Sequence, residues 1–381
     1  MRIILALGCM AWIALVLIDG FETLVLPRRV SRPYRYVRLF YLGMWRLWRA
    51  LALWLPLGKR RDNFLSYFGP FSILLLFSTW VTGLILGFAL LHSVLDTALH
   101  APDERVGFAT YLYLSGTTFF TLGFGDVTAI HAFGRFLTVA EAGMGFGFIA
   151  VIIGYLPVLY QAFSRREVTI SLLDARAGSP PSAGQLLSRV ARAGQLGAVN
   201  LFLLEWERWS AELLESHLSF PVLTYYRSQH DNQSWLAALT TILDTSALLL
   251  AAAQDADTYQ AQLTFAMARH AAVDLAMVFH TPPRPPDPER LPAQEWQRLR
   301  DALRGDGLAI REGSSVEKKL RDLRDTYEPF VNALARHLLL NMPLWFPEKL
   351  TVDNWQTSAW TRRTAGIGSL PLTDADREHL D

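Results

Sequence analysis

The chain has 381 residues, of which 51% are hydrophobic and only 19% are charged, and its formal net charge is +1. This length exceeds one ordinary domain, and a net charge so close to zero gives no indication of a nucleic-acid partner, so none is expected. Cys9 is the single cysteine, which excludes a disulfide framework and a cysteine-based metal site within one chain. Apolar residues are concentrated before about residue 160, which predicts a membrane part followed by a soluble part.

The first apolar segment runs from Ile3 to Ile18 and is just long enough to cross a bilayer. Arg2 precedes it, as in a signal peptide, but no small-x-small cleavage site follows. We therefore expect residues 1–26 to form an uncleaved transmembrane anchor helix, with a cleaved signal peptide as the alternative.

A basic connector follows at residues 27–66. Its basic residues occur with no acidic residue among them: Arg28, Arg29, Arg32, Arg35, Arg38, Arg46, Arg49, Lys59, Arg60 and Arg61. The positive-inside rule then places the connector in the cytoplasm and the amino terminus outside.

Within the connector, the apolar stretch Val37–Leu57 carries its arginines in one stripe at helical spacing and its tryptophans elsewhere. This pattern is typical of an amphipathic helix that lies in the membrane interface and contacts lipid phosphates. A spanning voltage-sensor helix is the alternative. The arginines lack the regular three-residue spacing of such a helix.

Residues 68–92 form an apolar segment long enough to cross the membrane from the cytoplasm outward. A mildly acidic loop follows. The next segment, residues 106–120, is apolar and aromatic.

The segment Thr121-Leu122-Gly123-Phe124-Gly125-Asp126 comes directly after this apolar stretch. Glycine enters positive φ without steric cost, so two alternate glycines allow a run in which successive carbonyls turn to one side. Such a row of oxygens replaces the water shell of a dehydrated cation. The Thr121 hydroxyl adds an oxygen at the inner end, Leu122 and Phe124 pack backwards into protein, and Asp126 lies at the outer mouth.

This motif resembles the selectivity filter of the potassium-channel superfamily, and the resemblance covers roughly residues 65–166. It implies a pore domain at 67–166 with an outer helix 68–92, a pore helix 106–120, a filter 121–126 and an inner helix 133–163. It also implies K⁺ as the permeating ion, held at Thr121, Leu122, Gly123, Phe124 and Gly125. Four copies would close the ring. Phe124 departs from the commoner tyrosine and lacks the hydroxyl that braces the filter from behind.

Three residues of the predicted inner helix stand out. The resemblance makes Gly145 the gating hinge, although close helix packing by Gly143 or Gly147 fits the sequence nearly as well. Pro157 removes a backbone hydrogen bond and should kink the helix near a lower gate. Glu141 is a carboxylate deep inside the span, which is costly and therefore a functional candidate. We expect it either to bond the pore helix behind the filter or to line the cavity.

Beyond the pore domain, residues 167–352 have the pattern of a helical cytoplasmic domain. A short strand is expected at Val168–Leu173, and the proline-rich segment 281–292 is a possible linker within the domain. Residues 353–381 read as a polar tail. No glycine-rich nucleotide fingerprint, Walker loop or His-Glu-x-x-His motif is present, so no enzymatic activity and no cofactor are expected.

The sequence thus predicts an all-α membrane protein: a homotetrameric, potassium-selective channel with an extra amino-terminal helix, an interfacial helix and a regulatory cytoplasmic domain with an unknown ligand or partner. The expected location is the plasma membrane, the inner membrane if the source is bacterial, with the carboxy terminus in the cytoplasm. A weakly selective cation channel and a membrane-anchored sensor with a non-conducting pore module are the alternatives.

Overall fold

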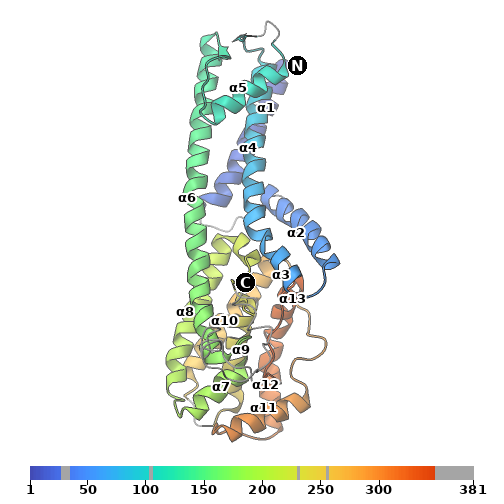
Figure 1. Ribbon diagram of the computed structural model, residues 1–381, viewed down its shortest axis with the longest axis vertical. Helices are drawn as coiled ribbons and strands as arrows, with labels where there is room; N and C mark the ends of the chain where they lie inside the picture. Colours follow the sequence, from blue (N-terminus) through green and yellow to red (C-terminus); the bar gives the residue numbers. More distant parts are fainter. Residues whose placement is uncertain (27–34, 103–105, 230–231, 255–256, 348–381) are drawn as a thin grey trace, which may run out of the picture. The chain divides into compact units, whose positions relative to one another are not determined.

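The structure is a computed structural model that describes residues 1–26, 35–102, 106–229, 232–254 and 257–347. The predicted tail 353–381 and part of the basic connector lie outside these residues. Two compact units make up the chain, Met1–Gln161 and Ala162–Asp381. We call them the amino-terminal unit and the carboxy-terminal unit, and the long helix α6 (Ala132–Ala177) begins in the first and ends in the second (Figure 1).

The described part of the amino-terminal unit consists of helices, the loops between them and one short strand pair. Its helices are α1 (Arg2–Leu24), α2 (Tyr36–Trp54), α3 (Lys59–Ser66), α4 (Phe68–Val94), α5 (Phe108–Phe119) and the first part of α6. The strands β1 (Leu99–His100) and β2 (Thr128–Ala129) pair antiparallel, with Leu99 opposite Ala129. Figure 1 shows α5 between α4 and α6 at one end of this unit.

Helix α1 packs along α4 through side chains that sequence periodicity does not identify. The indole Nε1 of Trp12 donates to the carbonyl of Gly83 at 2.9 Å. A Cβ at Gly87 would lie 2.8 Å from Ile13, so only glycine allows this approach. Near the other end, Trp80 Nε1 donates to the buried carboxylate of Asp19 at 2.9 Å. The apolar amino-terminal segment is therefore built into the helix packing of its unit.

Helix α2 occupies the stretch expected to lie in the membrane interface, and its tryptophans pack on neighbouring aromatic rings. Trp45 contacts Phe68 edge-on, with ring centroids 4.8 Å apart. Trp48 stacks on Phe64 of α3 at 4.6 Å and donates from Nε1 to the carbonyl of that residue. Trp54 at the end of the helix is exposed. Aromatic packing thus fixes one face of α2 and leaves another open.

The carboxy-terminal unit contains the end of α6 followed by a helical bundle. Its elements are α7 (Ala183–Arg192), α8 (Ala198–Ser219), the 3₁₀ turn η1 (Pro221–Tyr225), α9 (Trp235–Ala252), α10 (Tyr259–Val278), α11 (Ala293–Gly305), α12 (Ser314–Asp325) and α13 (Glu328–Leu338). The proline-rich segment does not divide this unit, because the Asn332 amide on α13 donates to the carbonyls of Arg284 and Pro285.

The prediction of a strand at Val168–Leu173 is wrong, because these residues belong to α6, which continues to Ala177. Ile170 and Leu173 are buried, whereas Val168 and Leu172 are exposed. This burial follows helical spacing, not the alternation of a strand. The β-branched residues favour a strand locally, and packing of one helical face overrides that preference.

Among the described residues, four helical segments are long and apolar enough to cross a membrane by length and composition: Arg2–Leu24, Lys59–Val94, Ala132–Ala177 and Trp235–Ala252. The last, α9, differs from the others because all 18 of its residues are buried in the carboxy-terminal unit. Its apolar composition is that of a central core helix. The charged Asp244 in its middle also argues against a membrane span.

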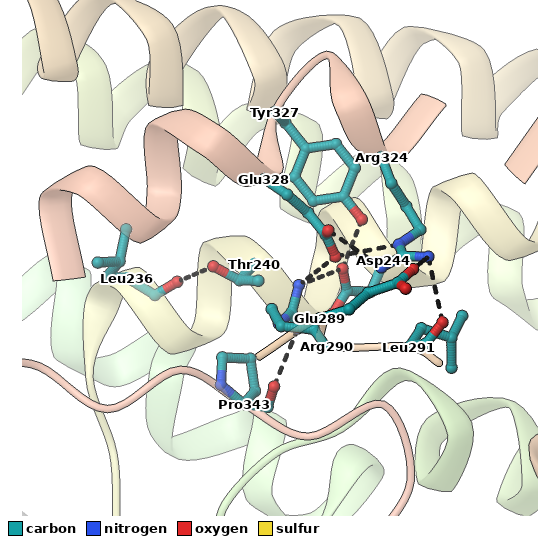
Figure 2. Close-up of polar contacts among 10 residues, drawn as sticks. All are labelled: Leu236, Thr240, Asp244, Glu289, Arg290, Leu291, Arg324, Tyr327, Glu328 and Pro343. Carbon is teal, nitrogen blue, oxygen red and sulfur yellow. Dashed lines mark hydrogen bonds and ion pairs between the residues drawn. The ribbon is translucent and has the colours of Figure 1, made fainter. Parts of the chain in front are cut away.

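Asp244 anchors a buried network of charges that joins α9 to α12, α13 and the chain before α11 (Figure 2). Arg290 pairs with Asp244 at 2.6 Å and with Glu328 at 2.9 Å, and Arg324 pairs with Glu328 at 3.2 Å. Burial beside Asp244 and Glu328 holds the pKa of Tyr327 well above its usual range. The Tyr327 hydroxyl therefore keeps its proton and donates it to Asp244 at 2.5 Å.

We predict that Arg290→Met lowers the free energy of unfolding by about 3–5 kcal/mol, because Asp244 and Glu328 would stay buried without this cation. The measurement is thermal and denaturant unfolding of the full chain in detergent, followed by tryptophan fluorescence. Arg300→Met is the control, since Arg300 pairs at 3.5 Å with the exposed Asp301 and should contribute less than about 1 kcal/mol. Equal losses in both variants would contradict a structural role for the network.

Candidate functional site

The candidate site begins at α5, the short helix predicted as the pore helix. Tyr111, Leu114 and Phe119 form its buried face, and α5 packs against α4. The helix starts after Gly107, whose backbone N–H donates to the Thr110 hydroxyl at 3.2 Å. It ends just before the glycine-containing motif, so α5 fixes where that motif starts.

The backbone of the motif alternates in handedness. Thr121, Gly123 and Gly125 have φ of 56°, 56° and 81°, whereas Leu122 and Phe124 between them keep negative φ. Residues of opposite handedness in alternation turn successive carbonyls toward one side of the chain. Thr121 is β-branched, and positive φ is an outlier for such a residue, with a cost of about 1–3 kcal/mol. This strain is a typical sign of a functional segment.

Two backbone hydrogen bonds from α5 hold the entry to the motif. The N–H of Thr121 donates to the carbonyl of Thr118 at 3.0 Å, and that of Leu122 donates to the carbonyl of Thr117 at 2.8 Å. The side chains of Leu122 and Phe124 are 56% and 67% exposed. Within one chain they therefore do not make the backward packing that the sequence led us to expect.

Asp126 at the end of the motif has a partner that the sequence analysis missed. The Tyr113 hydroxyl on α5 donates to Asp126 Oδ2 at 2.8 Å. A tyrosine on the helix before the motif thus braces the exit from that side, in a protein whose motif carries Phe124 without a hydroxyl. Tyr113 lies one to two turns before the end of α5. Its closeness to the motif in the sequence is the signal that could have indicated this contact.

The chain beyond the motif is tied back to the loop after α4. Strand β2 pairs with β1, and the N–H of Ile130 donates to the carbonyl of Ala98 at 3.0 Å. Arg135 Nε donates to the carbonyl of Ala129 at 3.1 Å. At Gly134 a Cβ would lie 2.6 Å from Thr97, which explains a glycine at this place. The motif is therefore held at both ends.

Gly145 lies on α6 where this helix passes the end of α5. A Cβ there would lie 2.3 Å from the carbonyl oxygen of Phe119, whereas a Cβ at Gly143 or Gly147 would meet no atom within 4 Å. Close packing accordingly accounts for Gly145, the residue expected to be the hinge, and not for its neighbours. The gating role of Gly145 stays a prediction, as does that of Pro157, which is exposed inside α6.

Glu141, one turn before Gly145, is fully buried. Its Oε2 lies 3.7 Å from His92 Nε2 on α4, and Ser115 of α5 is a further neighbour. The carboxylate is thus directed toward α4 and α5. Among the described residues no group of three or more His, Cys, Asp or Glu side chains could hold a metal ion.

We predict that Gly145→Ala lowers the free energy of unfolding by about 1–3 kcal/mol, because its methyl group forces α6 away from the Phe119 carbonyl. Gly143→Ala is the matched control. It meets open space in the chain and should be neutral or stabilising by up to about 1 kcal/mol, since alanine favours a helix. The melting temperatures of the two purified variants decide the matter, and equal shifts would contradict the packing argument.

Comparison with known proteins identifies the region that contains this site. Residues 74–161 match the model of the ion channel family. Over 205 residues, 51% of this chain and 58% of the relative, the chain is 23% identical to the uncharacterized membrane protein YdjJ of Bacillus subtilis. Over 84 residues, 19% of this chain and 62% of each relative, it is 34% and 36% identical to Protein LctB of Geobacillus stearothermophilus and of Bacillus caldotenax.

The chain spans about three fifths of the length of these curated relatives. No solved structure matches it. The family match favours transport over catalysis, and the apolar helices favour a membrane location. Residues 74–161, with α5, the motif at 121–126 and most of the membrane part of α6, are therefore similar to an ion-channel domain of a membrane protein.

Proposed function

We propose that this chain forms a potassium-selective channel in which four copies surround one ion path. The observation that carries the proposal is the alternating handedness at Thr121, Gly123 and Gly125, directly after α5. The strained threonine supports it, because a simple turn needs no β-branched residue at positive φ. The ion-channel match over residues 74–161 provides the context.

In this mechanism K⁺ sheds its water at the filter. The carbonyl oxygens of Thr121, Leu122, Gly123 and Phe124, together with the Thr121 hydroxyl, take the place of the hydration shell. Ions at neighbouring sites repel one another, which moves them along the row. The Asp126 carboxylate, braced by Tyr113, attracts cations to the outer mouth.

Exposed apolar groups favour assembly of several copies. Leu122 and Phe124 are largely exposed among the described residues, and α6 exposes Phe136, Val139 and Phe146. Non-helical backbone at membrane depth is tolerated only where protein or a water-filled path covers it. Neighbouring copies would cover one side of the filter and leave the carbonyl side open to the ions.

The orientation proposed from the basic connector places the amino terminus outside and the carboxy-terminal unit in the cytoplasm of the cell, next to the plasma membrane. Helix α2 fits an interfacial position, since Arg46 and Trp54 are exposed beside its packed tryptophans. Contact with anionic lipid headgroups is part of this proposal.

Regulation by the carboxy-terminal unit is proposed from Arg166, near the end of α6. The guanidinium is buried and donates to the carbonyls of Leu223 and Tyr226, each at 2.9 Å. Its NH1 also lies 3.2 Å from His217 Nε2. Burial and the Arg166 cation hold the pKa of His217 well below its usual range. His217 is therefore neutral, with Nδ1–H toward the Leu213 carbonyl and the Nε2 lone pair toward Arg166.

Potassium flux into liposomes that contain the purified full-length protein tests the proposal. We predict flux that barium blocks, and its loss in Gly123→Ala, because alanine at positive φ costs about 1–2 kcal/mol in each copy and tilts the carbonyls. Gly147→Ala, where a Cβ meets open space in the chain, should keep the flux.

Reversal potentials in opposed potassium and sodium gradients test selectivity in the same preparation. A clear preference for potassium is expected. Equal permeability would indicate a weakly selective cation channel, and absence of flux in the full chain and in a chain shortened after Arg166 would indicate a sensor that does not conduct.

We predict that Arg166→Met changes the open probability of the channel several-fold without changing the reversal potential. The variant removes the contacts of this part of α6 with His217 of α8 and the Leu223 carbonyl of η1. The exposed neighbour Arg165 supplies the control, and Arg165→Met should behave as the wild type. Single-channel open probability in planar bilayers is the measurement. Indistinguishable behaviour of the two variants would count against regulation through this residue.

A further inference from the structure

Three polar side chains lie fully buried where α4, α5 and α6 meet: His92, Ser115 and Glu141. In the part of the chain that the structure describes, His92 Nε2, Ser115 Oγ and both carboxylate oxygens of Glu141 make no hydrogen bond. A buried carboxylate without hydrogen bonds is costly, and more so in a membrane. An ionisable group retained under these conditions calls for a reason other than stability.

The helix geometry places this cluster beside the filter. Gly145 on α6 touches the backbone of Phe119, the last residue of α5. Glu141 lies one turn before Gly145, and its neighbour Ser115 lies one turn before Phe119. The same faces of α5 and α6 therefore meet over two successive turns, and Glu141 occupies the turn next to the filter-bearing end of α5.

His92 extends the cluster to the chain that follows the filter. Its Nδ1 lies 3.1 Å from the Thr97 hydroxyl, and the Thr97 carbonyl accepts a hydrogen bond from the Tyr111 hydroxyl at 3.1 Å. The next residues, Ala98 and β1, bind Ile130 and β2. A path of short contacts thus leads from Glu141 through His92 and Thr97 to the strand just after Asp126.

One assignment of protons satisfies the facing groups. In this assignment the Thr97 hydroxyl donates to His92 Nδ1, and Nε2–H points to Glu141 Oε2 at 3.7 Å. The opposite tautomer would set the Nε2 lone pair against the carboxylate. At this distance the attraction is electrostatic, and the low dielectric of the helix packing strengthens it.

We propose that Glu141 and His92 are positioning residues of the filter: their pairing holds the exit strand β2 and the end of α5 at the spacing that keeps the carbonyls of residues 121–124 directed at the ions. Neither side chain touches an ion. The inference rests on the proposed potassium channel and adds residues outside the filter that set its selectivity.

The test is the potassium-to-sodium permeability ratio of the full-length protein in planar bilayers. Glu141→Leu should lower this ratio about tenfold, since it removes the carboxylate that attracts the buried His92 Nε2–H. Glu141→Gln should restore most of the ratio, because its amide oxygen keeps a partial negative charge facing that N–H. The exposed His100 on β1 provides the control, and His100→Gln should leave the ratio unchanged.

A double-mutant comparison of the permeability ratio tests more directly whether the two residues act as a pair. The double variant His92→Leu/Glu141→Leu removes both polar groups and should be closer to the wild type than Glu141→Leu alone. Losses that multiply in the double variant would overturn the pairing. Melting temperatures identify any variant that fails to fold. If Glu141→Leu does not fold, the permeability ratios of Glu141→Gln and of the double variant test the pairing.

The two proposals fail in different ways. A wild-type protein without potassium preference would overturn the channel proposal and this inference together. A potassium-selective wild type whose Glu141→Leu variant folds and keeps the wild-type ratio would overturn the inference alone.

Discussion

A backbone whose residues alternate in handedness pairs its carbonyls in neither a helix nor a sheet, and the surroundings of residues 121–125 are organised by this constraint. Residues 121–125 form no helix or strand, so their conformation depends on what surrounds them. Helix α5 holds the entry through Thr117 and Thr118, and Tyr113 holds Asp126. The close approach of α6 at Gly145 keeps the end of α5 in place. A strained segment persists because rigid neighbours determine it.

Asp244 and Glu141 are buried carboxylates with different surroundings. In the carboxy-terminal unit Asp244 has two arginine hydrogen bonds and a tyrosine hydroxyl, so its charge is matched inside the core. Glu141 has only the distant imidazole of His92 as an ionisable partner shown by the structure. A buried carboxylate whose partner lies beyond hydrogen-bond distance gains less from that partner than one held by direct hydrogen bonds.

The parts of the chain that could be predicted from sequence are those with a local signal. The apolar spans around α1, α4 and α6 follow from hydropathy, and the glycines at 123 and 125 indicate the unusual backbone. Tyr113 and His92 carry no such signal, because their partners lie on other elements. The prediction of a strand at Val168–Leu173 was wrong for the same reason. Burial of Ile170 and Leu173 stabilises the helix, and this packing has no local signal in the sequence.

The contacts of Arg166 depend more on backbone than on side chains. Two of its acceptors are main-chain carbonyls, those of Leu223 and Tyr226, and every amino acid supplies such a group. Substitution of either residue leaves the acceptor in place as long as η1 keeps its turn. The attachment of Arg166 therefore depends on the local backbone path, whereas the side chains of η1 have a separate role: Val222, Leu223, Thr224 and Tyr225 are buried in the bundle.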